Sequence, residues 1–299
     1  MRTPPAQWIL ARAIGLLAIG LLAIGAPAIA QSPSPAAGVA PTPSCAPMAS
    51  SAPLPSAAPA DPLAVGDLTV FAAASLARPF GEFQAPWEAA HPGSELVFSF
   101  DASSALRTQV EQGAPADVFA SADTRNPQAL VDECLATDLT AFAGNHLVVV
   151  VPTGNPAGIT SPADLATPGL KVVAAGPDVP IARYATQLID TLAALPGYPA
   201  DFAAAVAANV VSQEDNVKAV LAKIELGEGD AAIVYVTDAV SSTAVETVAI
   251  PDEANVVATY AAAAVTDAAD PALASDFLAF LSGSEAQAVL AGYGFLPAP

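Results

Sequence analysis

Leu68-Thr-Val-Phe-Ala-Ala-Ala-Ser75 is the stretch that decides the fold of this chain. Its first residues are β-branched and apolar, which is typical of a buried strand, and the side chains that follow Ser75 change to helical spacing. Those side chains are Leu76, Phe80, Phe83 and Trp87. The stretch therefore predicts a strand that passes directly into a helix, with the Ser75 hydroxyl at the helix N-terminus.

The same alternation of short apolar runs and helical patterns continues along the chain. Further strands are predicted at residues 95–100, 117–120, 147–151, 170–175, 231–235 and 254–265, and the last of these returns the chain to the part where it began. A final helix is predicted from about Pro271 to Ala291. Strands that alternate with helices favour an α/β fold whose sheets are mainly parallel.

Three more helix starts are predicted, and the first two follow predicted strands, as Ser75 does. They are Asp101-Ala-Ser-Ser104, Val179-Pro180 and Asp215-Asn-Val217. Helix N-termini attract anions because their first N–H groups lack partners within the helix and the helix dipole adds partial positive charge. Ordinary capping is the more frequent role of a serine at such a position. The joint occurrence of these starts is therefore more informative than any one of them, since two lobes joined by crossing strands would place them around one cleft.

The first 65 residues have the composition of an export segment and a tether. Arg2 and Arg12 precede an apolar run, and Ala28-Ile-Ala30 supplies small residues for cleavage, which together predict a secretory signal peptide over residues 1–30. A permanent membrane anchor is the alternative, but the uninterrupted apolar run is shorter than the ~20 residues that a membrane helix needs. Residues 31–65 are rich in Pro, Ala and Ser, and are predicted to form a disordered linker.

The charge balance excludes some classes of function. Of the nine Lys and Arg residues, Arg2 and Arg12 belong to the predicted signal peptide, which leaves seven in a chain of net charge −20. No basic stripe is available for phosphates, so nucleic-acid binding is not expected. An anionic ligand would have to be held by local dipoles rather than by lysines.

The two cysteines, Cys45 and Cys134, permit several interpretations. No C-x-x-C or Cys/His cluster indicates zinc. Cys134 lies in an apolar stretch predicted to be helical, where a buried structural thiol is the common case. A Cys45–Cys134 disulfide and lipid modification of Cys45 both stay open, although Thr42-Pro-Ser44 matches a lipoprotein signal poorly.

The motifs resemble those of the periplasmic molybdate-binding protein family, part of the type II solute-binding superfamily. The resemblance runs from about Leu68 to Phe295 and is carried by these motifs in this order: Thr69-Val-Phe-Ala-Ala-Ala-Ser-Leu76, Gly113-Ala-Pro-Ala-Asp-Val-Phe119, Val179-Pro180, and Ile233-Val-Tyr235 with Asp238-Ala239. It implies a two-lobed α/β fold, each lobe a mainly parallel sheet flanked by helices, with the ligand in the cleft between the lobes. The implied first lobe is residues 66–146 with 265–299, and the second is residues 147–264.

The resemblance also implies the function and the ligand-binding residues. It implies a monomeric protein, periplasmic or tethered outside the cytoplasmic membrane, that binds molybdate or tungstate, needs no cofactor and delivers the oxyanion to the permease of an ABC importer. The implied binding groups are the hydroxyls and N–H groups of Ser75 and Ser103, the N–H groups of Ile181 and Val217, and the phenol of Tyr235.

Two features of the site depart from the family pattern. Asp101 places a carboxylate near the site, and Ile181 is bulkier than the small residue often found there, although only its backbone is needed.

Other functions stay open at this point. Molybdate, tungstate and sulfate are fully deprotonated and can be held by donors alone, whereas phosphate carries a proton near neutrality and would favour an acceptor such as Asp101 or Asp215. An exported enzyme is the alternative from another class, but no G-x-S-x-G elbow, H-E-x-x-H helix or phosphate loop occurs. His91 and His146 are interpreted as structural residues, and the missing DNA-binding domain argues against a ligand-sensing regulator.

Overall fold

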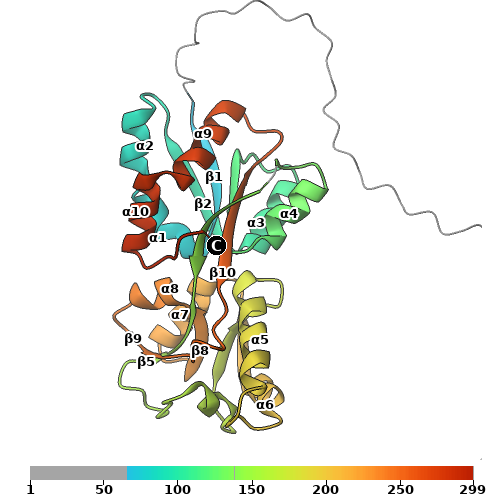
Figure 1. The fold of residues 1–299 in the computed structure, drawn as a ribbon, viewed down its shortest axis with the longest axis vertical. Coiled ribbons are helices and arrows are strands. Elements are labelled where there is room, and N and C mark those ends of the chain that lie inside the picture. The colour runs from blue at the N-terminus through green and yellow to red at the C-terminus, as the bar shows by residue number, and fades with distance from the viewer. Residues whose placement is uncertain (1–65, 138, 299) are drawn as a thin grey trace, which may run out of the picture. The chain divides into compact units, whose positions relative to one another are not determined.

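The computed structural model describes residues 66–137 and 139–298, which fold as two α/β lobes (Figure 1). The predicted signal peptide, the linker and Cys45 lie outside the described residues. Cys134 is disulfide-bonded. No helix among the described residues is long and apolar enough to cross a membrane.

The first lobe is built on a sheet with strand order β2-β1-β3-β10-β4. Its strands are β1 (Leu68–Ala73), β2 (Leu96–Asp101), β3 (Val118–Ser121), β4 (Thr140–Asn145) and β10 (Ala258–Ala264). Its helices are η1 (Ala74–Leu76), α1 (Ala77–Gly81), α2 (Gln84–Ala90), α3 (Ser103–Glu111), α4 (Arg125–Asp132), α9 (Pro271–Ser282) and α10 (Ser284–Gly292).

The second lobe is built on a sheet with strand order β7-β6-β8-β5-β9. Its strands are β5 (Leu147–Pro152), β6 (Val172–Ala175), β7 (Val210–Glu214), β8 (Ala231–Tyr235) and β9 (Val245–Val248). Its helices are η2 (Pro162–Ala166), α5 (Pro180–Ala193), α6 (Phe202–Ala208), α7 (Val217–Glu225) and α8 (Val236–Val240).

Each sheet is parallel apart from the strand that enters it from the other lobe. In the first sheet β1 pairs in parallel with β2 and β3, whereas β10 is antiparallel to β3 and β4. In the second sheet β6 pairs in parallel with β7 and β8, whereas β5 is antiparallel to β8 and β9. The expected fold of two mainly parallel sheets is therefore confirmed, with one reversed strand in each.

The chain crosses between the described lobes twice. The first crossing is at His146, between β4 and β5, and the second lies between β9 and β10. Asn255 ties the two crossing segments together, because its Oδ1 accepts from the Leu147 N–H at 3.1 Å and its Nδ2 donates to the Leu147 carbonyl at 2.9 Å. The boundary expected at residues 264/265 assigned β10 to the second lobe, but its pairings place it in the first sheet.

The predicted apolar face after Ser75 forms part of the core. Leu76, Phe80, Phe83 and Trp87 are all fully buried. The element is not one continuous helix, however, because Pro86 has no N–H to donate to the carbonyl four residues earlier and the helix restarts at Gln84.

Two elements near the chain end and around Cys134 differ from the expectation. The predicted final helix is two helices, separated by the extended backbone of Gly283. Cys134 lies beyond the end of α4 with a φ of 60°, so it is not helical.

The face of the first sheet that carries Phe71 has its own smaller core. Phe71 and Phe119 pack there against Leu106 and Val110 of α3 and Leu130 of α4. The opposite face carries Val70 and Ala72 and belongs to the larger core, which continues through the second lobe. Packing on both faces fixes the orientation of β1, and with it the position at which Ser75 leaves the strand.

Two glycines before β8 have different structural roles. Gly227 has a φ of +71°, which favours glycine. A Cβ on Gly229 would lie 2.4 Å from Cγ2 of Val173 and 2.9 Å from Cδ1 of Ile224. Gly229 therefore allows α7 to pack closely against β6 on the way into β8.

Substitution Gly229→Ala tests this packing. We expect it to lower the free energy of unfolding by about 1–3 kcal/mol, because the added methyl overpacks a β-branched neighbour. The matched control is Gly81→Ala, at the end of α1, where an added Cβ meets nothing within 4 Å. Chemical denaturation of both variants measures the difference, and equal stability of the two would contradict the packing argument.

Candidate functional site

The carboxyl ends of five parallel strands meet at one small cavity between the lobes. In the first lobe β1 leads into η1 and β2 leads into α3, and in the second lobe β6 leads toward α5, β7 toward α7 and β8 into α8. Ligand sites of parallel α/β sheets form at this edge. The cavity is lined by Ala73, Ala74, Ser75, Asp101, Ala102, Ser103, Ala122, Val179, Pro180, Ile181, Asn216, Val217 and Tyr235. All five residues implied by the family resemblance are among them.

The first lobe contributes two buried serines. Ser75 is the middle residue of η1 and is 4% exposed, and Ser103 is the first residue of α3 and is 1% exposed. The Ser103 Oγ accepts a hydrogen bond of 3.0 Å from the backbone N–H of Ala122. The Ser75 Oγ lies 2.9 Å from the phenol oxygen of Tyr260. Neither serine is used as a helix cap.

The second lobe contributes the starts of two helices. Pro180 is the first residue of α5, where its fixed φ suits the helix and its missing N–H costs nothing, and Ile181 follows it. Asn216 caps α7, since its Oδ1 accepts from the Ala219 N–H at 3.1 Å, and Val217 is the first helical residue. The N–H groups of Ile181 and Val217 belong to the first turns, where N–H groups have no acceptor within the helix.

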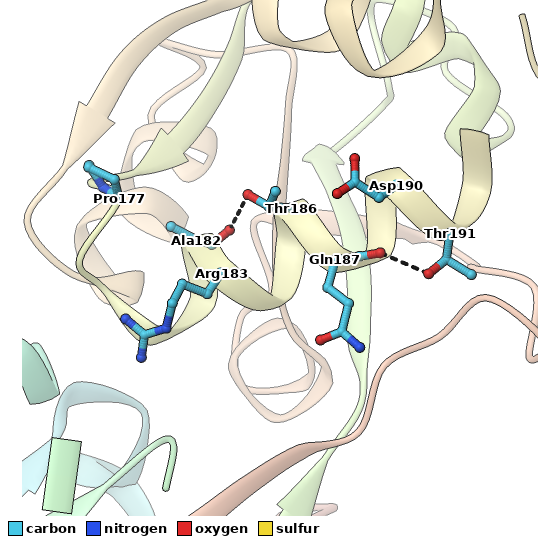
Figure 2. Close-up of a pocket in the computed structure, with 7 residues that line it drawn as sticks. All are labelled: Pro177, Ala182, Arg183, Thr186, Gln187, Asp190 and Thr191. Atoms are coloured by element: carbon cyan, nitrogen blue, oxygen red, sulfur yellow. Dashed lines mark hydrogen bonds between the residues drawn. The ribbon is translucent and has the colours of Figure 1, made fainter. Parts of the chain in front are cut away.

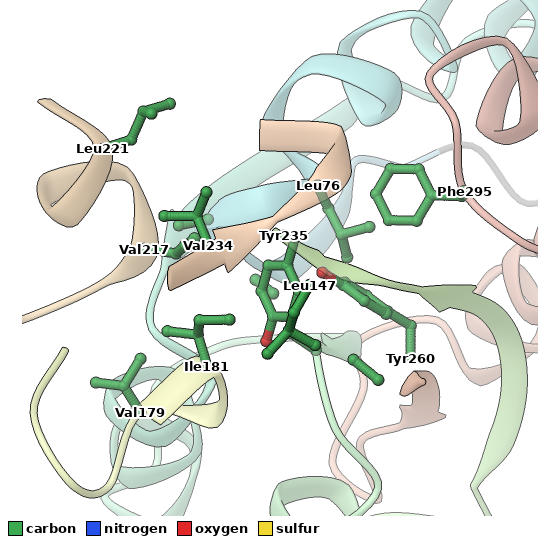
Figure 3. Packing of buried hydrophobic residues seen from close by; sticks show 14 of the residues in the cluster. Leu76, Leu147, Val179, Ile181, Val217, Leu221, Val234, Tyr235, Tyr260 and Phe295 are labelled. Atoms are coloured by element: carbon green, nitrogen blue, oxygen red, sulfur yellow. The ribbon is translucent and has the colours of Figure 1, made fainter. Parts of the chain in front are cut away.

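Tyr235 ends β8 and brings its phenol to the cavity. The side chain is 1% exposed, and among the described residues its Oη has no hydrogen-bond partner. Burial raises the pKa of this phenol well above its ordinary value, and the neighbouring Tyr260 adds to the effect. The group therefore keeps its proton and is an unused donor. Figure 3 shows Tyr235 beside Tyr260 and close to Ile181, with ring centroids of the two tyrosines 5.7 Å apart.

A buried ion pair holds α7 and α8 together behind this edge. Lys218 Nζ lies 2.6 Å from Oδ1 of Asp238, which is fully buried. Burial raises the pKa of Asp238, and the charge of Lys218 opposes that change. Lys218 follows Val217 in α7, and Asp238 lies in α8, which begins directly after Tyr235. The ion pair therefore fixes the Val217 N–H and the Tyr235 phenol relative to each other.

Asp101 is the carboxylate that lines the cavity. Its Oδ1 accepts from the N–H of Ala102 at 2.7 Å and from Nδ2 of Asn216 at 3.0 Å. The second bond joins the two lobes directly. Asp215, the other carboxylate considered from the sequence, lines a neighbouring groove instead.

Further contacts across the lobes close the cavity. Arg183 of α5 is ion-paired with the buried carboxylate of Asp123, and Arg78 of α1 donates to the Ser241 carbonyl at 2.8 Å. The remaining space is about 10 Å³, about what one water molecule occupies by the same measure. A tetrahedral anion is larger than this space, so the cavity would have to widen to admit one.

A larger hollow lies outside the cleft and lacks converging donors. It has a volume of about 540 Å³ and runs along α5 (Figure 2). Two of its hydroxyls are satisfied by their own helix, since Thr186 donates to the Ala182 carbonyl and Thr191 to the Gln187 carbonyl, each at 2.8 Å. It is an open surface along α5.

The two histidines lie away from the cavity lining. His91 stacks on Trp87 with ring centroids 3.8 Å apart, and His146 occupies the first crossing between the lobes. Among the described residues no group of three or more His, Cys, Asp or Glu side chains could hold a metal ion. The polar groups that line the cavity are hydroxyls, N–H groups, the Asn216 amide and the Asp101 carboxylate.

Sequence reasoning missed the residues that support the site. Tyr260, Asn145 and Arg183 contact groups that are far away in the sequence, so no local motif marks them. One signal was available for Tyr260, which is a single tyrosine in the apolar run Ala254–Val265. A buried phenol needs a partner for its O–H.

Two α/β lobes joined by two crossings, with a donor-lined cavity between them, define a two-lobed solute-binding protein. The chain belongs to the family described as bacterial extracellular solute-binding protein, whose model matches residues 68–296.

Relatives with curated names support this assignment. The molybdate-binding protein ModA of Mycobacterium tuberculosis is 40% identical over 230 residues, which cover 76% of this chain and 84% of that protein. The molybdate-binding protein ModA of Escherichia coli is 32% identical over 239 residues, which cover 77% of this chain and 89% of that protein.

Solved structures share the fold at lower sequence identity. The periplasmic molybdate-binding protein of Azotobacter vinelandii superposes with a TM-score of 0.65 at 21% identity, covering 78% of this chain and all of that one. The sulfate-binding protein SubI of Mycobacterium tuberculosis superposes with a TM-score of 0.70 at 22% identity, covering 78% of this chain and 87% of that one.

Proposed function

We propose that this protein captures molybdate or tungstate outside the cytoplasmic membrane and delivers the oxyanion to an ABC importer. The observation that carries the proposal is the convergence of Ser75, Ser103, Ile181, Val217 and Tyr235 on one buried cavity. The printed names of the 40% and 32% identical relatives supply the ligand class.

The chemistry of the cavity suits a dianion that carries no proton. Hydroxyl and N–H groups are donors, and a fully deprotonated oxyanion offers acceptors in every direction. Hydrogen bonds to a charged group contribute ~1.5–3 kcal/mol each, so several of them can hold the anion without a cationic side chain. Among the residues that the structure describes, no Lys or Arg lines the cavity.

Export and delivery complete the proposal. The predicted signal peptide over residues 1–30 and the linker over residues 31–65 would place the binding lobes outside the cytoplasmic membrane. Closure of the lobes around the anion would give the loaded binding protein a different shape from the empty one, and the transporter could recognise that difference. We propose that the protein acts as a monomer and binds its ligand without transforming it.

Sulfate is the second candidate, because the sulfate-binding protein SubI shares the fold with a TM-score of 0.70. Sulfate is also a dianion that accepts hydrogen bonds only. The same donors serve molybdate and sulfate. The size of the closed cavity therefore decides which of the two anions binds more tightly.

Isothermal titration of the purified protein with molybdate, tungstate, sulfate and phosphate tests the proposal. We expect molybdate and tungstate to bind at submicromolar dissociation constants, with sulfate and phosphate at least about a hundredfold weaker, since a misfitting anion leaves buried donors unpaired. Tight binding of sulfate with no binding of molybdate would favour the second candidate. Tight phosphate binding without molybdate would contradict both.

The double variant Ser75→Ala with Tyr235→Phe tests the assignment of the site. It removes one hydroxyl from each lobe, and we expect molybdate affinity to fall by at least about a hundredfold, which corresponds to two charge-assisted hydrogen bonds. The matched control is Ser242→Ala with Tyr198→Phe, whose side chains do not line the cavity. Unchanged affinity in the first variant, with a normal thermal midpoint, would show that the anion binds elsewhere.

A further inference from the structure

Ser75 is bonded to a tyrosine that lies outside the cavity lining. Tyr260 of β10 is fully buried, and its Oη is 2.9 Å from the Ser75 Oγ, 185 positions away in the sequence. β10 has an irregular register between Tyr260 and Ala261. Such a bulge re-aims a side chain, and here the side chain points at the serine.

A second hydrogen bond to the Tyr260 phenol, from Asn145, indicates the direction of the bond between Tyr260 and Ser75. Asn145 Nδ2 donates to the Tyr260 Oη at 3.5 Å and to the Thr237 Oγ1 at 2.8 Å. Since an amide nitrogen donates only, the phenol accepts from Asn145, and this favours donation of its own proton to the Ser75 Oγ. Burial, followed by the nearby charge of Asp238, raises the pKa of Tyr260 well above its ordinary value, so that proton is retained.

Ser103 shows the same arrangement with no choice of direction. Its Oγ accepts from the backbone N–H of Ala122, which can act only as a donor. The proton of the Ser103 hydroxyl is therefore free for the cavity. The unpartnered phenol of Tyr235 offers a third O–H.

We propose that Tyr260, supported by Asn145, is a specificity-determining residue that fixes the Ser75 hydroxyl as a donor toward the ligand. A serine hydroxyl has one proton to donate and two lone pairs that accept. A bond received from Tyr260 occupies one of those lone pairs and leaves the proton for the ligand. With Ser103 held likewise by Ala122, both serines meet the ligand with protons.

This arrangement discriminates between anions by their protonation state. The inference rests on the proposed function. An oxyanion without protons can accept from every hydroxyl, whereas an anion that carries a proton places a donor against a donor and leaves both unpaired. Asp101 is the carboxylate of the lining, and because its Oδ1 already receives two hydrogen bonds, only its Oδ2 is left to accept such a proton. Tyr260 thus acts on selectivity through Ser75, without contact to the ligand.

Substitution Tyr260→Phe removes only the phenol hydroxyl. It frees the lone pair of the Ser75 Oγ that the phenol occupied. We expect molybdate affinity to fall by about tenfold, because the serine proton is no longer held toward the ligand. Affinity for inorganic phosphate at neutral pH should stay unchanged or rise, so the ratio of the two dissociation constants narrows by at least about tenfold. The matched control Tyr198→Phe makes the same chemical change beside Phe202, away from the cavity.

A double-mutant cycle separates this role from a general loss of structure. In the Ser75→Ala background, Tyr260→Phe should have no further effect on the selectivity ratio, because the residue acts through that hydroxyl. Equal losses of affinity for molybdate and phosphate in Tyr260→Phe would overturn this inference but not the proposed function. The same change of the selectivity ratio by Tyr260→Phe with and without the Ser75 hydroxyl would do likewise. If the unaltered protein bound no molybdate, the proposed function would fail and the inference with it.

Discussion

Buried hydrogen-bond donors need acceptors, and several donors that have no partner among the described residues line the cavity between the two lobes. The phenol of Tyr235 has no partner there, and the first N–H groups of α5 and α7 have no acceptor within their helices. Leaving such groups buried and unpaired costs about 1–3 kcal/mol each. An anion that accepts from all of them removes that cost, so the same constraint explains both ligand capture and lobe closure.

The topology brings those donors together. Each sheet receives one reversed strand from the other lobe, β10 in the first and β5 in the second. The crossings therefore set the carboxyl ends of the parallel strands of both sheets against one cavity. Asn255 holds the two crossing segments side by side through Leu147. Direct contacts such as Asp101 with Asn216 then join the lobes at the cavity edge.

Much of the fold was predictable from local sequence. The runs at residues 68–74, 147–151 and 231–235 are short and apolar, and the structure has strands there. The helix starts at Ser103, Pro180 and Val217 could be located because strands end and helical spacing begins at those points. The break before Gln84 could also be predicted, since Pro86 has no N–H to donate to the carbonyl four residues earlier and fits only in the first turn of a new helix. These features depend on neighbours in the chain.

The remaining features depend on partners far apart in the sequence. Nothing local to Ser75 indicates that Tyr260 holds its hydroxyl, and nothing local to Arg183 indicates its pairing with Asp123. The membership of β10 in the first sheet follows from its pairing with β3 and β4 rather than from its composition. The sequence thus located the groups around the cavity, while their hydrogen-bond directions required the packed structure.

The anion would be held by neutral donors in a closed cavity of a strongly acidic protein. The dependence of molybdate affinity on ionic strength is the measurement that distinguishes such a site from one that uses exposed cations. Attraction between exposed charges weakens as salt is added, whereas hydrogen bonds inside a closed cavity are screened far less. We predict that affinity changes little with salt, or rises slightly as repulsion by the net charge of −20 is screened. A steep loss of affinity with added salt would show that exposed cationic side chains bind the anion, and would contradict this account.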